Sequence, residues 1–226
     1  MQHDETDLVH WWFDGSLRSL FFLAGEAAGS PRASLEDEVL RFCRTLISSS
    51  VASRLHSPSA VADQLALLAL RWDAELGSAA PQDVADDLER AAGRTRTGEF
   101  LHLLADLVRA AELEAAHDYT SLPMNHWEAL TMYRSIFQFT YLFDSGDFGD
   151  RADAIRARIR GECSTNCRGE LATLVAEVSD ALVRFPDDES LEANLGPAMP
   201  WATRAVLIEI NRQAHEHLSG HHAQGR

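Results

Sequence analysis

The residues best suited to chemistry flank and enter one aromatic-rich stretch, 117–148. Two histidines there stand close to a carboxylate: His117 precedes Asp118, and His126 lies two residues before Glu128. A carboxylate near an imidazole can fix its tautomer and raise its basicity, as a general base requires. We expect these four residues to form the catalytic set if the protein is an enzyme.

The same residues also have a purely structural interpretation. Asn125 is a strong candidate for a helix N-cap, because its short side chain can accept a hydrogen bond from a first-turn N–H. His126 and Glu128 would then simply occupy the first turn of the helix. The sequence leaves both interpretations open.

A polar stripe follows within the stretch. Steps of three and four residues place Thr131, Arg134, Ser135 and Gln138 on one face of a helix. Because arginine keeps its charge, Arg134 needs a carboxylate, carbonyl oxygens, water or an anionic ligand. The structural interpretation is a salt bridge to Glu128 or to an acid on a neighbouring helix, and the functional one is a site for a substrate carboxylate, sulfate or phosphate. On the second interpretation the expected substrate-binding residues are Arg134 and Gln138, with the aromatic side chains of Trp11, Trp127, Tyr133 and Tyr141.

Two Glu-x-x-His units offer an alternative chemistry, because carboxylate-bridged di-iron bundles use that unit twice. Here the pairs are Glu99 with His102 and Glu114 with His117, and both lie in one expected helix. The two units start about 22 Å apart at the usual helical rise, so they cannot share one metal centre. A di-iron site would therefore need carboxylates from other helices, such as Glu170, Glu177 or Glu209. We expect no metal and no cofactor.

Composition excludes several function classes. All 20 basic residues are arginine, so chemistry that needs a lysine amine is excluded, including Schiff-base catalysis. A formal charge of −15 disfavours binding to nucleic acid. The chain has one basic run, which we interpret as a solvated helix face or an anion site; it consists of Arg151, Arg156, Arg158, Arg160 and Arg168. The most apolar run, 20–25, is too short to span a bilayer, and three cysteines do not make a disulfide framework. We expect a cytoplasmic protein.

The elements that must position these residues are helices. Strand-like alternation is absent, whereas helical periodicity recurs with plausible starts at Ser34, Ser57, Pro81 and Thr97. The sequence predicts an all-α protein: one domain, 1–226, of eight or nine helices in an orthogonal or bundle-like array. A central aromatic helix over about 125–144 is expected to organise it, with a disordered tail from about residue 219.

These patterns favour a small metal-independent enzyme that binds an organic substrate, neutral or anionic, in a helical cavity. Acid–base chemistry, such as cyclisation, elimination, isomerisation or intramolecular displacement, would suit the residues available. The alternatives are a non-catalytic ligand-binding, regulatory or partner-binding subunit, and a di-iron oxidase-like bundle. A homodimer or a protein partner is compatible with each.

Overall fold

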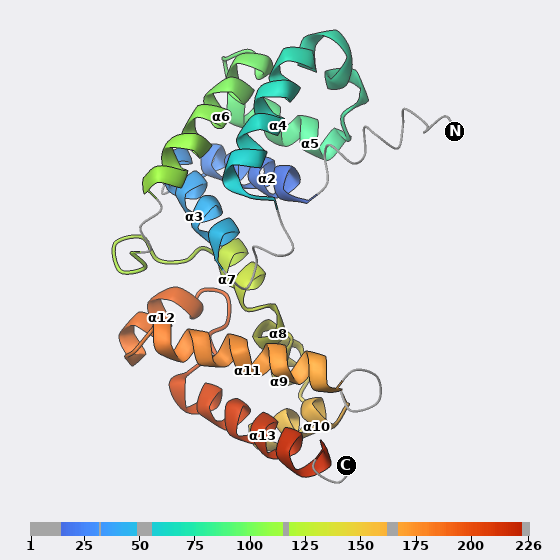
Figure 1. Cartoon of the computed structure of the whole chain (residues 1–226), viewed down its shortest axis with the longest axis vertical. Coiled ribbons are helices and arrows are strands. Elements are labelled where there is room, and N and C mark those ends of the chain that lie inside the picture. Colours follow the sequence, from blue (N-terminus) through green and yellow to red (C-terminus); the bar gives the residue numbers. More distant parts are fainter. Residues whose placement is uncertain (1–14, 32, 49–55, 115–117, 162–166, 223–226) are drawn as a thin grey trace, which may run out of the picture. The chain divides into compact units, whose positions relative to one another are not determined.

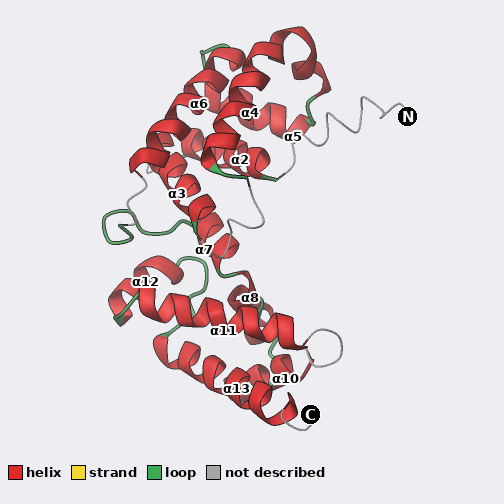
Figure 2. Ribbon diagram, viewed as in Figure 1, coloured by secondary structure: helices red, strands yellow, loops and turns green. Residues whose placement is uncertain are grey.

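The computed structural model describes residues 15–31, 33–48, 56–114, 118–161 and 167–222. Within these ranges every regular element is helical and none is a strand (Figure 2), which confirms the all-α prediction. The chain divides into two compact units, Met1–His117 and Asp118–Arg226. We describe each unit by itself, and the expectation of one domain stays a prediction.

The first unit is a set of helices that pack against one another (Figure 1). Helix α4 packs against α6, α2 packs against α5, and α3 lies between α2 and α6 in the packing order. After its last residue α4 continues into a π-helical turn, Trp72–Leu76, and a 3-10 turn, Gly77–Ala79. The helices are α2 (Ser16–Gly29), α3 (Leu35–Ile47), α4 (Pro58–Arg71), α5 (Gln82–Ala92) and α6 (Thr97–Glu114).

Caps and an apolar core explain this arrangement. Ser34 and Ser57 each accept a hydrogen bond from a backbone N–H of the following first turn, as their positions predict. Cys43 lies fully buried in the core and donates to the carbonyl oxygen of Val108. Burial, followed by the nearby charge of Glu112, raises the pKa of the Cys43 thiol to about 12. This cysteine is therefore a packing residue and not a nucleophile.

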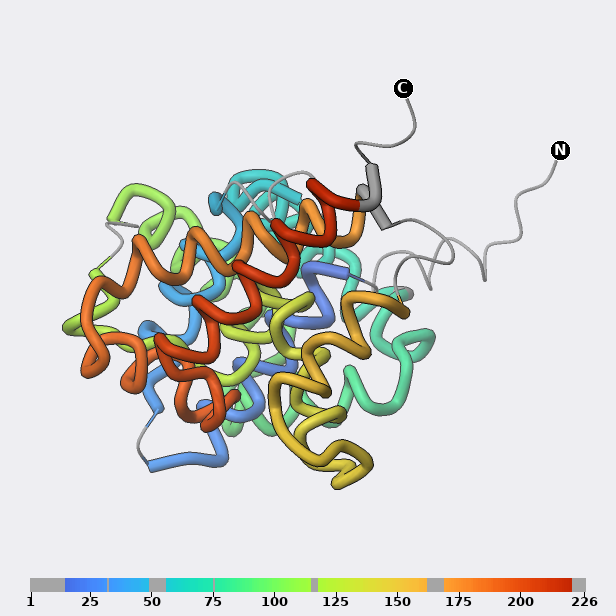
Figure 3. The backbone as a smooth tube through the Cα atoms, turned by 90° about the horizontal axis from the view of Figure 1, so that it is seen from below, coloured from blue at the N-terminus to red at the C-terminus, as the bar shows by residue number. Residues whose placement is uncertain are grey.

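The second unit is organised by its longest helices, α11 and α13, which run side by side (Figures 1 and 3). Helix α8 also packs on α11, and α10 packs on α9 and α13. Buried apolar side chains from these helices, among them Phe139, Leu174 and Leu207, form the core together with Phe185, which directly follows α11. The helices are α7 (His126–Met132), α8 (Arg134–Phe137), α9 (Phe139–Asp144), α10 (Arg151–Gly161), α11 (Cys167–Arg184), α12 (Asp188–Leu195) and α13 (Arg204–His222).

The expected continuous aromatic helix over 125–144 is wrong in one respect, because the segment is three short helices. The helix ends at Met132, and the backbone of Tyr133 leaves the helical region with φ −119° and ψ 44°. A further break at Gln138 separates α8 from α9. The sequence contains no glycine or proline at either break.

The physical reason for the first break lies on α11. The buried carboxylate of Glu177 accepts hydrogen bonds from the backbone N–H groups of Ser135 (2.7 Å) and Ile136 (3.1 Å) and from the Ser135 hydroxyl (3.0 Å). First-turn N–H groups have no acceptor within their own helix, and a carboxylate satisfies them well. Glu177 therefore lets a new helix start where α7 has ended.

The end of the last helix also differs from the expectation. Helix α13 continues to His222, beyond the point near residue 219 at which a disordered tail was expected. Among the described helices, none has both the length and the apolar character needed to cross a membrane.

Candidate functional site

The expected catalytic residues that the structure describes lie in the turn at 118–121 and in the first turn of α7. His117 lies outside the described residues. Asp118 is exposed, and its carboxylate accepts hydrogen bonds from the backbone N–H groups of Thr120 (2.9 Å) and Ser121 (3.3 Å). Hydrogen bonds from the side chain of Ser121 and from these backbone groups lower the pKa of Asp118. A carboxylate held in this way orders a turn and is a weaker base than an unperturbed one.

The second expected pair forms the start of α7. Asn125 is the N-cap, with its side-chain oxygen accepting from the backbone N–H of Glu128 at 2.7 Å. His126 is exposed, and its ring meets that of Phe137 edge to face at a centroid distance of 6.3 Å. The Glu128 side chain is buried. The structure thus confirms the cap, the structural interpretation of this segment.

Tyr133, expected to contact substrate, is instead a core residue. Its hydroxyl donates to a carboxylate oxygen of Asp180 at 2.8 Å. Arg184 donates to both oxygens of the same carboxylate, at 2.8 and 3.1 Å. Burial and the neighbouring Asp180 charge raise the pKa of Tyr133 well above its ordinary value. The Tyr133–Asp180–Arg184 group is therefore an internal polar network that holds the break after α7 against α11.

Of the other expected aromatic residues, the structure describes Tyr141 and Trp127. Tyr141 is largely exposed and contacts the ring of Phe137 at a centroid distance of 5.8 Å. Trp127 is half-buried, and its carbonyl oxygen accepts from the hydroxyl of Thr131. Trp11 lies outside the described residues.

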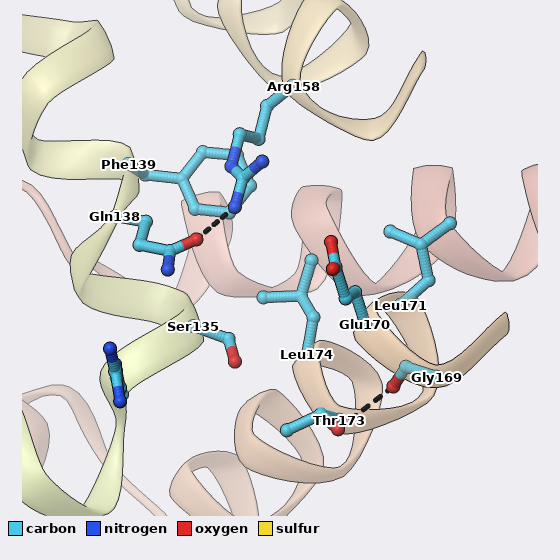
Figure 4. A pocket seen from close by; sticks show the side chains of 10 residues that line it. Ser135, Gln138, Phe139, Arg158, Gly169, Glu170, Leu171, Thr173 and Leu174 are labelled. Carbon is cyan, nitrogen blue, oxygen red and sulfur yellow. Dashed lines mark hydrogen bonds between the residues drawn. The ribbon is translucent and has the colours of Figure 1, made fainter. Parts of the chain in front are cut away.

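Arg134 and Gln138, in contrast, line the same pocket, as the stripe predicts. The pocket has a volume of about 460 Å³ and lies among α8, α9, α10 and α11 (Figure 4). The base of the pocket is apolar, because it is formed by the side chains of Phe139, Leu171 and Leu174, which are almost fully buried. The full lining comprises Arg134, Ser135, Gln138, Phe139, Arg158, Gly169, Glu170, Leu171, Thr173 and Leu174.

One wall of the pocket is rich in hydrogen-bond donors. The half-buried guanidinium of Arg158, on α10, donates to the side-chain oxygen of Gln138 (Figure 4). This bond leaves the amide N–H groups of Gln138 as the donors that it can offer to the pocket. Burial lowers the pKa of Arg158, but an arginine stays cationic at neutral pH. Arg134 adds a second guanidinium, exposed at the rim.

The opposite wall, at the start of α11, is rich in acceptors. Figure 4 shows the Glu170 carboxylate directed into the pocket space. The Thr173 hydroxyl donates to the carbonyl oxygen of Gly169 at 2.9 Å, so its own oxygen can still accept. Both Glu170 and Thr173 are exposed, which places them at the rim.

The two charged side chains at the rim, Arg134 and Glu170, are without an ion-pair partner among the described residues. In the part of the chain that the structure describes, no carboxylate lies within ion-pair distance of Arg134, and no cationic side chain lies within that distance of Glu170. The internal salt bridge expected as one interpretation of Arg134 is not formed among these residues. Although Arg134 and Glu170 line one pocket, they do not pair with each other.

Two further cavities of the second unit have different character. In one, of about 530 Å³ between α12 and α13, Arg204 donates to the carbonyl oxygens of Leu182 and Phe185 and so closes the end of α11. In the other, of about 370 Å³ between α10 and α13, Arg212 is paired with Glu209 and Glu216 at 2.6 and 2.5 Å. Arg204 and Arg212 already bind acceptors within the protein, which makes them weaker candidates for binding a ligand.

From the sequence, Glu170 was expected only as one of the carboxylates that a di-iron site would need, and Arg158 was not expected to bind an organic substrate. Arg158 belongs to the basic run, which had an anion-site interpretation as well as that of a solvated face. The basic run was therefore the sequence pattern that indicated the part of the donor-rich wall formed by Arg158. No local pattern marks Glu170, because its place in the pocket depends on how α11 packs against α8.

The Glu-x-x-His units do not assemble a metal site among the described residues. Glu99 is exposed and paired with Arg96 at 2.8 Å, and both His102 and Glu114 are exposed. No group of three or more His, Cys, Asp or Glu side chains in the described ranges is arranged to hold a metal ion.

No protein-family model, curated protein or solved structure matches the chain.

Proposed function

We propose that the second unit binds a small organic molecule that carries a carboxylate or phosphate group and an apolar body. The ligand occupies the pocket among α8, α9, α10 and α11, with its anionic group on the Arg134 and Arg158 side. A volume of about 460 Å³ is within the usual size range of small-molecule sites.

The observation that carries this proposal is the unpaired Arg134 guanidinium beside the Arg158–Gln138 pair, over an apolar floor. Guanidinium groups bind carboxylates and phosphates through two parallel charge-assisted hydrogen bonds. Phe139, Leu171 and Leu174 form an apolar base beneath the pocket surface. Because they are almost fully buried, the apolar surface that a ligand can cover comes mainly from the methylene groups of Arg134 and Gln138 and the methyl group of Thr173.

Catalysis remains a separate prediction. Among the described lining residues, Glu170 is the carboxylate able to act as a proton acceptor, so acid–base chemistry at this pocket would depend on it. The lining supports ligand binding without requiring a reaction, which favours the ligand-binding alternative. The cytoplasmic location and the homodimer or protein partner expected from the sequence also stay predictions.

The proposal is tested by calorimetric titration of the protein with hexanoate and hexyl phosphate, which share an apolar chain and differ in the anionic group. Hexanol, with no charge, is the reference ligand. We expect one or both anions to bind more tightly than hexanol. Arg134→Gln should weaken that binding about five-fold, the size of an interaction between partly exposed charges.

The matched control is Arg94→Gln. Arg94 is also an exposed arginine without a partner among the described residues, and it lies in the first unit, outside the pocket. Its replacement should leave binding unchanged. Equal affinity for hexanol and both anions, or equal loss in the two variants, would contradict the proposal.

A further inference from the structure

The pocket has two chemically opposite walls. The wall formed by α8, α9 and α10 presents donors and positive charge through Arg134, Arg158 and Gln138. The wall formed by α11 presents acceptors and negative charge through Glu170 and Thr173. A ligand whose only charged group is anionic would pair with the first wall, and the negatively charged Glu170 carboxylate would then face that ligand without a partner on it.

We propose that the ligand is a zwitterion, an aliphatic amino carboxylate whose carboxylate lies on the Arg134 wall and whose ammonium group lies on the Glu170 wall. This inference rests on the proposed function and adds to it the class of ligand. An amino-group contact also explains why the two opposite charges of the rim face one pocket without forming an ion pair.

Hydrogen-bonding capacity supports the ammonium end. A protonated amine has three donors and no acceptor, so it needs a wall of acceptors. The Glu170 carboxylate accepts only, and the Thr173 oxygen can accept because its hydrogen is directed to the Gly169 carbonyl. An amine bound there would have acceptors from two side chains of one helical face, three residues apart.

Between the two polar ends the pocket is apolar. Leu174 lies between the Arg158–Gln138 pair and Glu170 in Figure 4, and the buried side chains of Leu171 and Phe139 also line the pocket. Methylene groups or an aliphatic side chain suit this surface, whereas a ligand that is polar along its whole length would leave its polar groups unsatisfied there. The ligand class is therefore an amino carboxylate with a hydrocarbon portion.

The experiment compares matched ligands by calorimetric titration: 4-aminobutanoate, 6-aminohexanoate and leucine, with hexanoate and hexylamine as the compounds that lack one charged group. We expect at least one amino carboxylate to bind about five-fold more tightly than hexanoate or hexylamine, since each end adds one partly exposed charge interaction. Glu170→Gln should remove the advantage over hexanoate and leave hexanoate affinity the same or slightly higher. The control Glu192→Gln, at an exposed position of α12 outside this pocket, should keep the advantage.

The outcomes separate this inference from the proposed function. Hexanoate binding as tightly as every amino carboxylate overturns the zwitterion and leaves the anion site in place. An advantage for the amino carboxylate that survives Glu170→Gln also overturns the inference, because the amine then binds elsewhere. No binding of any of the carboxylates overturns the inference, and the absence of hexyl phosphate binding as well overturns the proposed function too.

Discussion

Replacing Glu177 by alanine should destabilise the second unit and disturb its pocket. Glu177 is buried on α11 and accepts three hydrogen bonds from the first turn of α8. That turn carries Arg134 and Ser135, which line the pocket. One side chain therefore determines both how the helix starts and where the pocket residues stand.

The expected size follows from the groups that lose their acceptor. A buried donor without a partner costs about 1–3 kcal/mol, so the N–H of Ile136 and the half-buried N–H of Ser135 together predict a loss of about 3 kcal/mol for Glu177→Ala. Glutamine keeps an oxygen that can accept from both N–H groups, and its amide can donate to the Ser135 oxygen. Glu177→Gln should therefore cost only about 1 kcal/mol, the loss of charge assistance.

Urea unfolding followed by far-ultraviolet circular dichroism measures both free energies. Glu192→Ala, an exposed glutamate on α12, is the control and should change the free energy of unfolding by less than about 0.5 kcal/mol. A Glu177→Ala effect as small as that of the control would refute the capping role. Equal losses for alanine and glutamine would show that charge, and not acceptor geometry, is what matters.

Three further predictions follow from other contacts. Tyr133→Phe should lower the free energy of unfolding by about 1–2 kcal/mol in the same assay, because Asp180 loses a buried donor; an unchanged value would contradict the network. Hydrogen bonds from Arg212 and Gln213 lower the pKa of Glu209 from 4.5 to about 2. The contribution of ionised Glu209 to the free energy of unfolding should therefore be complete above pH about 4.5 and should be lost as the pH falls towards 2. Glu209→Gln should flatten that part of a plot of stability against pH, and an identical acid profile would speak against the pairing. His126→Ala should leave hexanoate affinity unchanged in calorimetry, since His126 does not line the pocket; a marked loss would mean that the ligand lies elsewhere.

Local patterns in the sequence were sufficient for the helical class and for several helix starts. Ser34, Ser57 and Asn125 act as the caps that their positions predict, and α5 ends at Ala92, just before Gly93. Each of these features depends on residues within one helical turn, so a short window of sequence contains the determining chemistry.

The break at Tyr133 could not be predicted in this way, because its cause is a carboxylate far away in the chain. Glu177 is 42 residues from Ser135, and nothing near Tyr133 marks a helix end. The pocket was predictable only in part, because some of its residues share a local pattern and others meet only through packing. Arg134 and Gln138 share a face through local periodicity, whereas Glu170 joins them only through the packing of α11 on α8.

The central claim, an anion bound at Arg134, is tested most directly by arginine footprinting. Phenylglyoxal modifies guanidinium groups, and peptide mass spectrometry gives the modification rate of each arginine with and without saturating hexanoate. We expect hexanoate to slow the modification of Arg134 several-fold while the rate at Arg94, an exposed arginine of the first unit, stays the same. Equal rates at Arg134 with and without hexanoate would contradict the claim.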